Sequence, residues 1–308
     1  MIELRIKDEF SPLEAVVLGT AKSNGGDPTY EEAYDPKSKE HIKAGTFPKE
    51  RDMVPEMEAF AEVLEKHGVT VYRPKVIQDY NQIFTRDIAF VIDETFVITQ
   101  MLEERSNEID AIQDFIDQMP ENSVVRMNGD AYLEGGDVMP VDEHIFVGYS
   151  ELEDFENYTV ARTNPAGLAF LQKQFPKRNI IGFELNKSDA DPRKNALHLD
   201  CCFQPLGLGH CIIHPEGFKN AEDVYFIKNY FGEENCFEIH ADEMYEMCSN
   251  VFSIKPNVVV SEKNFTRLNQ WLEEQGYTVE LVPYQEISKM EGLLRCSTLP
   301  LRRADTSK

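Results

Sequence analysis

Short β-rich runs recur along this chain of 308 residues, and in places two of them precede a helical pattern and a further run. The clearest instance has runs at 250–254 and 258–261, a helical pattern at 264–275, and another run at 279–282. A similar unit precedes it around residues 203–240. Strands that alternate with helices are typical of the α/β class. Because the units share no convincing residue-level similarity, the repeat is one of structure, not of sequence.

The apolar spacing predicts further elements on either side of this clear unit. Residues 55–67, 110–118 and 165–174 show the spacing of amphipathic helices, and Gly276 marks the end of the helix at 264–275. Short β-rich runs predict strands, which we place at 15–19, 70–72, 88–92, 95–98, 145–148 and 211–214. No linker rich in Pro, Gly or Ser divides the chain, so we expect one domain over 1–308. Residues 20–49 are polar and glycine-rich, which predicts a long loop or a lid.

Charge and composition narrow the classes of partner. The chain carries 55 acidic and 31 basic residues, a formal net charge of -24, and is 42% hydrophobic. Nucleic acids and anionic membranes attract basic surfaces, so neither is an expected partner. A small cationic substrate is compatible with this balance. The composition leaves a homo-oligomer open.

The chain shows no targeting or metal-binding pattern. No apolar run is long enough to span a bilayer, and the first seven residues alternate like a strand instead of forming a signal peptide. We therefore expect a cytoplasmic protein. The six cysteines are too sparse for a disulfide scaffold, and none forms a Cys-x-x-Cys pair. We expect neither a metal nor a cofactor.

Cys296 is the candidate nucleophile. It follows Arg295, and a neighbouring cation favours the thiolate, which is the reactive form of cysteine. A buried cysteine is more often an inert apolar residue, and Cys211, Cys236 and Cys248 are best interpreted so. The local sequence around Cys296, taken alone, slightly favours an inert residue over a nucleophile.

Three other short segments carry candidate acids and a base. His198 and Asp200 are alternate residues, which face the same way in an extended segment, and a histidine can transfer protons near neutral pH. Glu134 and Asp137 flank two glycines that let the backbone bend or approach closely, so both acids could line a cavity. Asp87 follows Phe-Thr-Arg at the start of a predicted strand. The alternatives are a hydrogen-bonded histidine, a turn with solvated acids, and an Arg–Asp pair at the surface.

Together these segments resemble the guanidino-group-modifying enzymes of the pentein fold: arginine deiminases, amidinotransferases and dimethylarginine hydrolases. The matching segments, at 84–87, 133–140, 198–200 and 295–301, occur in the order found in that family. The resemblance implies an α/β-propeller of five ββαβ-like units around a central pocket. It also explains the structural repeat.

The resemblance assigns a role to each matching residue. Cys296 is similar to the nucleophile that attacks the guanidinium carbon and forms a thiouronium-type intermediate. His198 would protonate the departing amine and then activate the second nucleophile, and Glu134 would orient that histidine. Asp87 and Asp200 match the carboxylates that grip the guanidinium nitrogens. Paired carboxylates suit a planar cation with several N–H donors.

The residues expected at the far end of the substrate are less firmly placed. Arg162 resembles the arginine of a Gly-x-Ser-x-Arg-Thr-Asn segment, which here contains an insertion at 151–160. Arg105 resembles a second anion-binding arginine, and Asp137 is a further candidate for substrate contact. For both arginines, a solvated surface position stays open.

The resemblance favours a hydrolase acting on arginine or a related guanidino compound over an amidinotransferase. The segments at 134–140 and 295–300 are more similar to arginine deiminases, whereas 203–209 and 301–303 are more similar to amidinotransferases. Residues 292–294 depart from the Gly-Gly pair that deiminases carry before Arg-Cys. A non-catalytic pentein-fold binding module would not need these candidate residues. A papain-like hydrolase would place its cysteine early and its histidine late, the reverse of this order.

Overall fold

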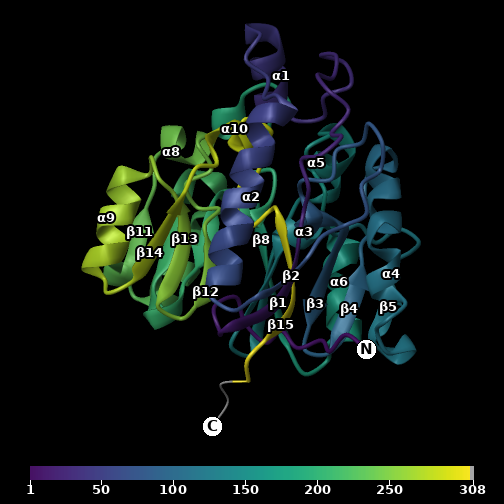
Figure 1. Cartoon of the computed structure of the whole chain (residues 1–308). Coiled ribbons are helices and arrows are strands. Elements are labelled where there is room, and N and C mark those ends of the chain that lie inside the picture. Colours follow the sequence, from purple (N-terminus) through teal and green to yellow (C-terminus); the bar gives the residue numbers. More distant parts are fainter. Residues whose placement is uncertain (306–308) are drawn as a thin grey trace.

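The computed structural model describes residues 1–305 and contains five sheets of three strands each (Figure 1). The middle strand of each sheet pairs antiparallel with one neighbour and parallel with the other. The sheets are β15 (Thr298–Arg303), β1 (Leu13–Leu18), β2 (Thr70–Tyr72); β3 (Ala89–Ile92), β4 (Thr95–Ile98), β5 (Val124–Arg126); β6 (Val138–Val141), β7 (His144–Tyr149), β8 (Asn179–Glu184); β9 (Phe203–Pro205), β10 (Cys211–Ile213), β11 (Cys236–Glu238); and β12 (Phe252–Lys255), β13 (Val258–Glu262), β14 (Thr278–Val282). The expected α/β fold of five ββαβ units is confirmed.

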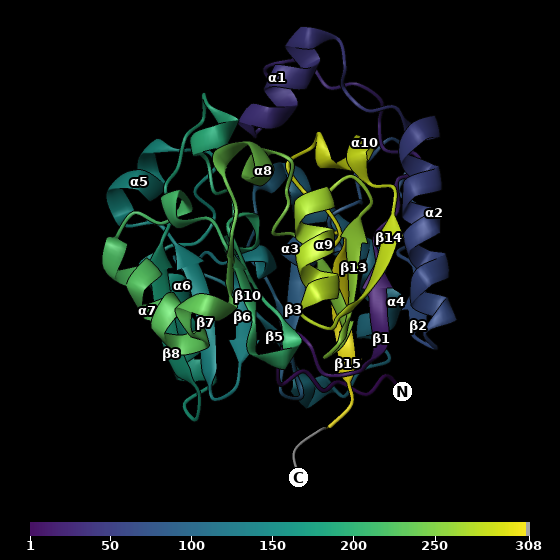
Figure 2. The same ribbon diagram turned by 90° about the vertical axis from the view of Figure 1, so that its left-hand side faces the viewer.

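Helices connect the two parallel strands of each unit and lie outside the sheets (Figure 2). The connecting helices are α2 (Glu50–Lys66), the 3₁₀ helix η1 (Glu103–Ile112) with α4 (Gln113–Ile116), α6 (Pro165–Gln174), α7 (Ala221–Phe231) and α9 (Thr266–Glu274). The remaining α-helices are α1 (Pro36–Ala44), α3 (Thr85–Ile88), α5 (Leu152–Asn157), α8 (Ala241–Tyr245) and α10 (Gln285–Ser288). Within residues 1–305, no helix is both long and apolar enough to cross a membrane.

Helix α2 shows why the apolar spacing was informative. Met53, Met57, Phe60 and Leu64 recur at intervals of three or four residues and are fully buried. They pack in one core cluster with strand residues such as Val16. The helix begins at Glu50, five residues before the predicted start.

The first unit takes one strand from each end of the chain. β1 pairs antiparallel with β15 and parallel with β2. Cys296 lies just before β15, so this pairing brings the late cysteine among segments that are distant in sequence. In Figure 1, β1 and β15 lie side by side near the middle of the molecule.

Three local predictions need correction. Residues 1–7 form no strand; Arg5 and Ile6 each make a single β-bridge, to Arg302 and Asp93. The helix expected at 110–118 is divided: residues 110–112 end the 3₁₀ helix η1, and only Gln113–Ile116 are α-helical, as the single turn of α4. The loop expected at 20–49 contains α1, which stands above the rest of the chain in Figure 1. Asp35 caps α1 and Gly45 ends it in the left-handed conformation.

Candidate active site

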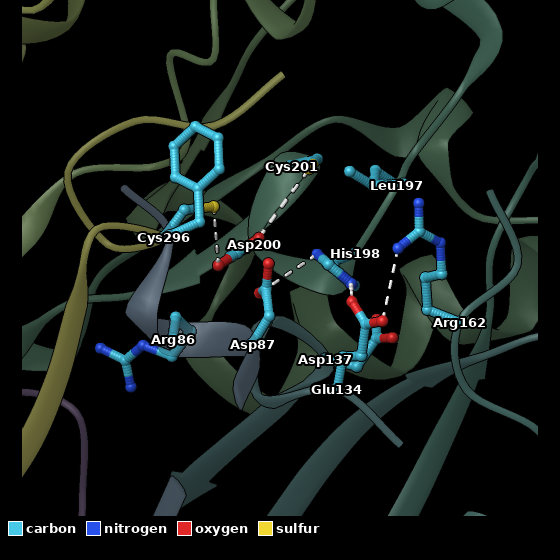
Figure 3. Close-up of polar contacts among 12 residues, drawn as sticks. Arg86, Asp87, Glu134, Asp137, Arg162, Leu197, His198, Asp200, Cys201 and Cys296 are labelled. Carbon is cyan, nitrogen blue, oxygen red and sulfur yellow. Dashed lines mark hydrogen bonds and ion pairs between the residues drawn. The ribbon is translucent and has the colours of Figure 1, made fainter. Parts of the chain in front are cut away.

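Loops from several units meet around a cavity of about 770 Å³. Its walls include Asp87 from α3, Arg105 from η1, Arg162 from the segment before α6, His198, and Cys296. The expected loop at 20–49 supplies another wall through Asn24, Tyr34, Asp35 and Phe47, among others. Figure 3 shows Asp87, His198 and Glu134 pointing toward one another from different elements, whereas the Arg86 side chain points away from them. Of the predicted site residues, five line the cavity: Asp87, Arg105, Arg162, His198 and Cys296. Glu134, Asp137 and Asp200 do not.

Cys296 is buried, and Asn250 holds it in place. The Asn250 side chain donates from Nδ2 to Sγ at 3.1 Å and accepts from the backbone N–H of Cys296 at 3.1 Å. Asp200 Oδ2 lies 3.6 Å from Sγ. Sequence reasoning missed Asn250, which lies 46 residues away along the chain. Its only signal is its position as the first residue of a predicted strand.

The surroundings of the free thiol favour protonation. Burial, followed by the carboxylates of Asp200 and Asp87, raises the pKa of Cys296 well above its usual value. Arg295 lowers this pKa, but too little to reverse the shift. The Arg295 guanidinium instead bonds to Asp200 at 2.8 Å and to Glu9 at 3.1 Å. Arg295 therefore favours the thiolate, as the sequence predicts, but burial and the two carboxylates outweigh it in the free site.

His198 is held between carboxylates. Its Nε2 lies 2.9 Å from Glu134 Oε2, and its Nδ1 lies 3.7 Å from Asp87 Oδ1. Burial alone would lower the pKa of His198, but Asp87, Asp137 and Glu134 raise it to about 9. Gly136 makes this packing possible, because a Cβ there would lie 2.6 Å from His198 Nδ1. At neutral pH the imidazole is a buried cation.

Glu134 also contacts an arginine. Arg162 Nη1 donates to its Oε1 at 3.3 Å. Burial would raise the pKa of Glu134, but Arg162 and His198 outweigh burial and lower it to about 2. Glu134 is therefore an ionised acceptor that can orient His198.

Asp87 has one carboxylate oxygen that accepts a short hydrogen bond and one that has only the 3.7 Å ion pair with His198. Arg105 Nη1 donates to Oδ2 at 2.7 Å, whereas Oδ1 is buried and accepts no hydrogen bond from residues 1–305. The surface Arg–Asp pair considered for this segment is wrong. Arg86 is buried and donates to Arg295 O and Thr298 Oγ1 instead.

Asp137 and Asp200 are fully buried and do not line the cavity. Asp137 accepts from the backbone N–H of Leu199 at 2.8 Å and from Thr163 Oγ1 at 2.6 Å. The segment after His198 is a turn of 3₁₀ helix, η5 (Leu199–Cys201), and not the extended strand assumed for the alternation argument. The hydrogen bond from Leu199 fixes that turn, so the structure places Asp137 as a positioning residue.

Both predicted anion-binding arginines are buried, so the solvated alternative is wrong for each. Arg105 is fully engaged, with hydrogen bonds to Glu108, Asp87 and Phe84 O. Arg162 donates to Thr159 O and Glu134, but its Nη2 is buried without a partner among residues 1–305. The insertion at 151–160 forms α5 and does not displace Arg162 from the cavity.

One cluster has the composition of a metal site. Ligand atoms of Asp87, Glu134 and His198 lie within 4.8 Å of one another. Arg105 reaches both carboxylates, at 2.7 Å from Asp87 and 3.9 Å from Glu134. A metal ion there would face a buried guanidinium, so these residues fit a metal poorly.

The arrangement of five ββαβ units around a pocket with a cysteine, a histidine and carboxylates defines a guanidino-group-modifying enzyme of the pentein fold. Residues 34–303 match the family described as N,N dimethylarginine dimethylhydrolase, eukaryotic. The chain belongs to this family.

Individual relatives agree with that assignment. The uncharacterized protein YkgA of Bacillus subtilis is 30% identical over 246 residues, which is 79% of this chain and 78% of YkgA. The amidinotransferase SxtG of Microseira wollei superposes with a TM-score of 0.76 at 19% identity, covering 98% of each chain. The N-terminal domain of ArgZ, a cyanobacterial arginine dihydrolase, gives 0.76 at 17% identity over 94% of this chain and 97% of that one. At these identities the two structures show a shared fold.

Proposed function

We propose that the protein hydrolyses a guanidino compound, arginine or a relative of it, through a covalent intermediate on Cys296. The observation that carries the proposal is Asp87 Oδ1, a buried carboxylate oxygen in the wall of the cavity that Cys296 also lines. It accepts no hydrogen bond from residues 1–305 and has only the 3.7 Å ion pair with His198. A buried acceptor of this kind calls for an N–H donor. A guanidinium group supplies such donors and a carbon that a thiolate can attack.

The proposed reaction has two halves. In the first, the thiolate of Cys296 bonds to the guanidinium carbon, and the C–N bond to the leaving amine breaks as His198 gives that amine a proton. In the second, neutral His198 takes a proton from water, and the hydroxide attacks the thiouronium carbon. The C–S bond then breaks, the thiolate returns, and the released amine takes up the remaining proton. The products are a ureido compound and an ammonium ion.

Because the pKa of the free thiol is raised, we propose that the bound substrate contributes part of the activation of Cys296. Burial and nearby carboxylates hold Cys296 protonated in the empty site. A bound guanidinium would neutralise part of that negative field and favour the thiolate. Asp200 contributes by fixing the thiol at 3.6 Å, and the Asp200–Arg295 ion pair in turn fixes Asp200.

Hydrolysis is favoured because the matching family is described as a hydrolase. The ArgZ domain has been solved covalently bound to a reaction intermediate, which supports a covalent route in this fold. The deciding experiment incubates the protein with guanidino compounds, with and without amine acceptors. Ureido products formed without an acceptor are expected. Products formed only with an acceptor would favour amidino transfer, and no reaction with any compound would count against both.

The charge on His198 predicts an alkaline limit to activity. Its proton is needed for the leaving amine, and its pKa is raised to about 9, so the proton is present below that pH and lost above it. We expect kcat to fall as the pH rises past the pKa of His198, because kcat reports the enzyme–substrate complex, in which the bound guanidinium has already favoured the thiolate. Glu134→Gln removes one carboxylate and should move the limit to lower pH. Glu143→Gln, a surface change, is the control; an unmoved limit in Glu134→Gln would contradict the assignment.

A metal-free mechanism predicts insensitivity to chelators. The side chains that could bind a metal are engaged with His198, Arg105 and Arg162. We expect turnover to be unchanged after prolonged incubation with EDTA and removal of the chelate. A loss of activity that added Zn²⁺ or Mg²⁺ restores would show that a metal is required.

A further inference from the structure

Two cysteines lie side by side on neighbouring strands, away from the cavity. Cys211 begins β10 and Cys236 begins β11, and the two residues are direct partners in the parallel pairing of these strands. The thiol of Cys211 donates to Cys236 Sγ at a sulfur–sulfur distance of 3.4 Å. Both cysteines are free, and neither lines the cavity. The proposed hydrolysis therefore makes no use of this pair.

The pairing of the two strands allows a disulfide bond between these cysteines. Neighbouring strands of a sheet lie about 4.8 Å apart, and the Cα atoms of a disulfide are usually ~4.4–6.8 Å apart. The contact between the two sulfur atoms shows that both side chains project from the same face of the sheet. Cys236 Sγ is also held 3.3 Å from Gly232 O, which keeps it beside Cys211. A bond could therefore form without a change in the order or register of the strands.

The two thiols differ in exposure and in acidity. Cys236 is half-buried on β11, an edge strand, whereas Cys211 is fully buried on the central strand β10. The hydrogen bond from Cys211 lowers the pKa of Cys236. Lys228 also lowers it, against the opposing effects of burial and of the carboxylates of Glu238 and Glu233. Burial, followed by the hydrogen bond to Cys236, raises the pKa of Cys211 well above its usual value.

This difference gives each cysteine a separate part in oxidation. The thiolate is the nucleophilic form, and the more exposed and more acidic thiol of a pair is the one that an oxidant reaches first. Cys236 meets both conditions. Cys211 lies within contact distance behind it, where it can attack an oxidised Cys236. An attacking thiol with a second thiol beside it is the arrangement found in redox-sensing cysteines.

We propose that Cys236 and Cys211 are a peroxide-sensitive modification site that forms a reversible disulfide. The proposal does not depend on the proposed function. The Cys236 thiolate attacks one oxygen of hydrogen peroxide, the O–O bond breaks, and the departing hydroxide takes up the proton that the thiol released, which gives water. Cys211 sulfur then attacks the sulfenic acid on Cys236, the S–O bond breaks, and the Cys211 proton leaves with the hydroxyl group as a second water. Two thiols are oxidised by two electrons and one peroxide is reduced.

The bond would join two strands of the unit that follows His198. β10 also pairs antiparallel with β9, and the N–H of His214 donates to Cys202 O at 2.7 Å, next to the turn that carries His198. The disulfide would close the segment that contains α7 without changing a residue that lines the cavity. Because β11 is an edge strand and Cys236 is half-buried, a reducing thiol could reach the bond and reverse it.

The test uses the full chain with Cys296→Ser, so that peroxide cannot act on the candidate nucleophile. The reduced protein is treated with hydrogen peroxide, the remaining thiols are blocked with N-ethylmaleimide, and the products are examined by intact-protein mass spectrometry and peptide mapping. We expect a linked pair of peptides that contain Cys211 and Cys236, the loss of two thiols, and recovery of both with reduced glutathione. Oxidation of the buried Cys248 should be at least about tenfold slower.

Two variants separate the parts played by the cysteines. In Cys211→Ala the reaction should stop at a sulfenic acid on Cys236, which dimedone traps. In Cys236→Ser, Cys211 should stay reduced. Cys248→Ser is the matched control and should leave the linked peptides unchanged.

Thermal unfolding of each reduced variant checks its fold. Cys236→Ser changes a half-buried position on an edge strand, so it keeps the test decisive even if Cys211→Ala, at a fully buried position, does not fold. Three results would overturn the proposal: no linked peptides at any peroxide concentration that oxidises Cys248, a bond from either residue to a different cysteine, or oxidation of Cys211 that proceeds equally well in Cys236→Ser.

Discussion

Replacing Cys296 with serine is expected to lower kcat by on the order of 10⁴-fold or more, because the hydroxyl is a far weaker nucleophile than the thiolate and the covalent route is lost. The fold should survive, since serine is smaller and can keep the hydrogen bonds that Asn250 makes with residue 296. Steady-state rates and thermal unfolding measured on the same preparation separate the two effects.

Cys236→Ser is the matched control for this substitution. Cys236 is half-buried on β11 and does not line the cavity. Its replacement should leave kcat within about twofold of the parent, because a change remote from the site usually costs little. Full activity in Cys296→Ser would eliminate Cys296 as the nucleophile.

Replacing Asp87 with asparagine is expected to weaken substrate binding by roughly 30-fold, which corresponds to about 2 kcal/mol for a charge-assisted hydrogen bond. Asparagine has nearly the same shape as aspartate, and its amide oxygen can still accept a hydrogen bond from Arg105. Its NH₂ group would then face the N–H donors of the ligand where Oδ1 now lies. Calorimetry in the Cys296→Ala background measures this loss without turnover.

The control for Asp87→Asn is Asp114→Asn. Asp114 is an exposed acid on α4, and it pairs with Lys75. It should leave the affinity unchanged. The affinity of Asp87→Asn for substrate should fall, but its melting temperature should change only slightly. Arg105 keeps Glu108 as an ion-pair partner in this variant. Unchanged binding of arginine-like compounds in Asp87→Asn would place the guanidinium clamp elsewhere.

The repeat of strands and helices could be predicted because it depends on local spacing. The predicted runs coincide with β1, β2, β3, β4, β7, β10, β12, β13 and β14 to within two residues at each end. Strand length does not explain the strands for which no separate run was predicted, because these include β8 and β15, of six residues each, whereas the three-residue β2 and β10 were predicted. The N-terminal alternation reflects burial of Ile2, Leu4 and Ile6, but the segment forms only single bridges, from Arg5 to Arg302 of β15 and from Ile6 to Asp93, and not a strand.

The site residues fall into the same two groups. Some can be recognised from their local sequence, and others depend on contacts between distant segments of the chain. The short motifs identified Cys296, His198, Glu134 and Asp87, because each matches a recognised segment. Asn250 and Glu9 have no such motif, and they matter only because the fold brings them to the Cys296 loop and to Arg295. The burial that outweighs Arg295 at the thiol is likewise set by the fold. The side chains of neighbouring residues can point in different directions. The Arg295 side chain points toward Glu9 and Asp200.

The most direct test of the proposed mechanism is to trap the covalent intermediate. The protein is mixed with L-arginine or its Nω,Nω-dimethyl derivative, quenched in acid within milliseconds to seconds, and examined by intact-protein and peptide mass spectrometry. We predict an adduct with the mass of the substrate minus the departed amine, confined to the peptide that contains Cys296 and absent from Cys296→Ser. Turnover with no adduct at any time, or an adduct on a different cysteine, would contradict a nucleophilic Cys296.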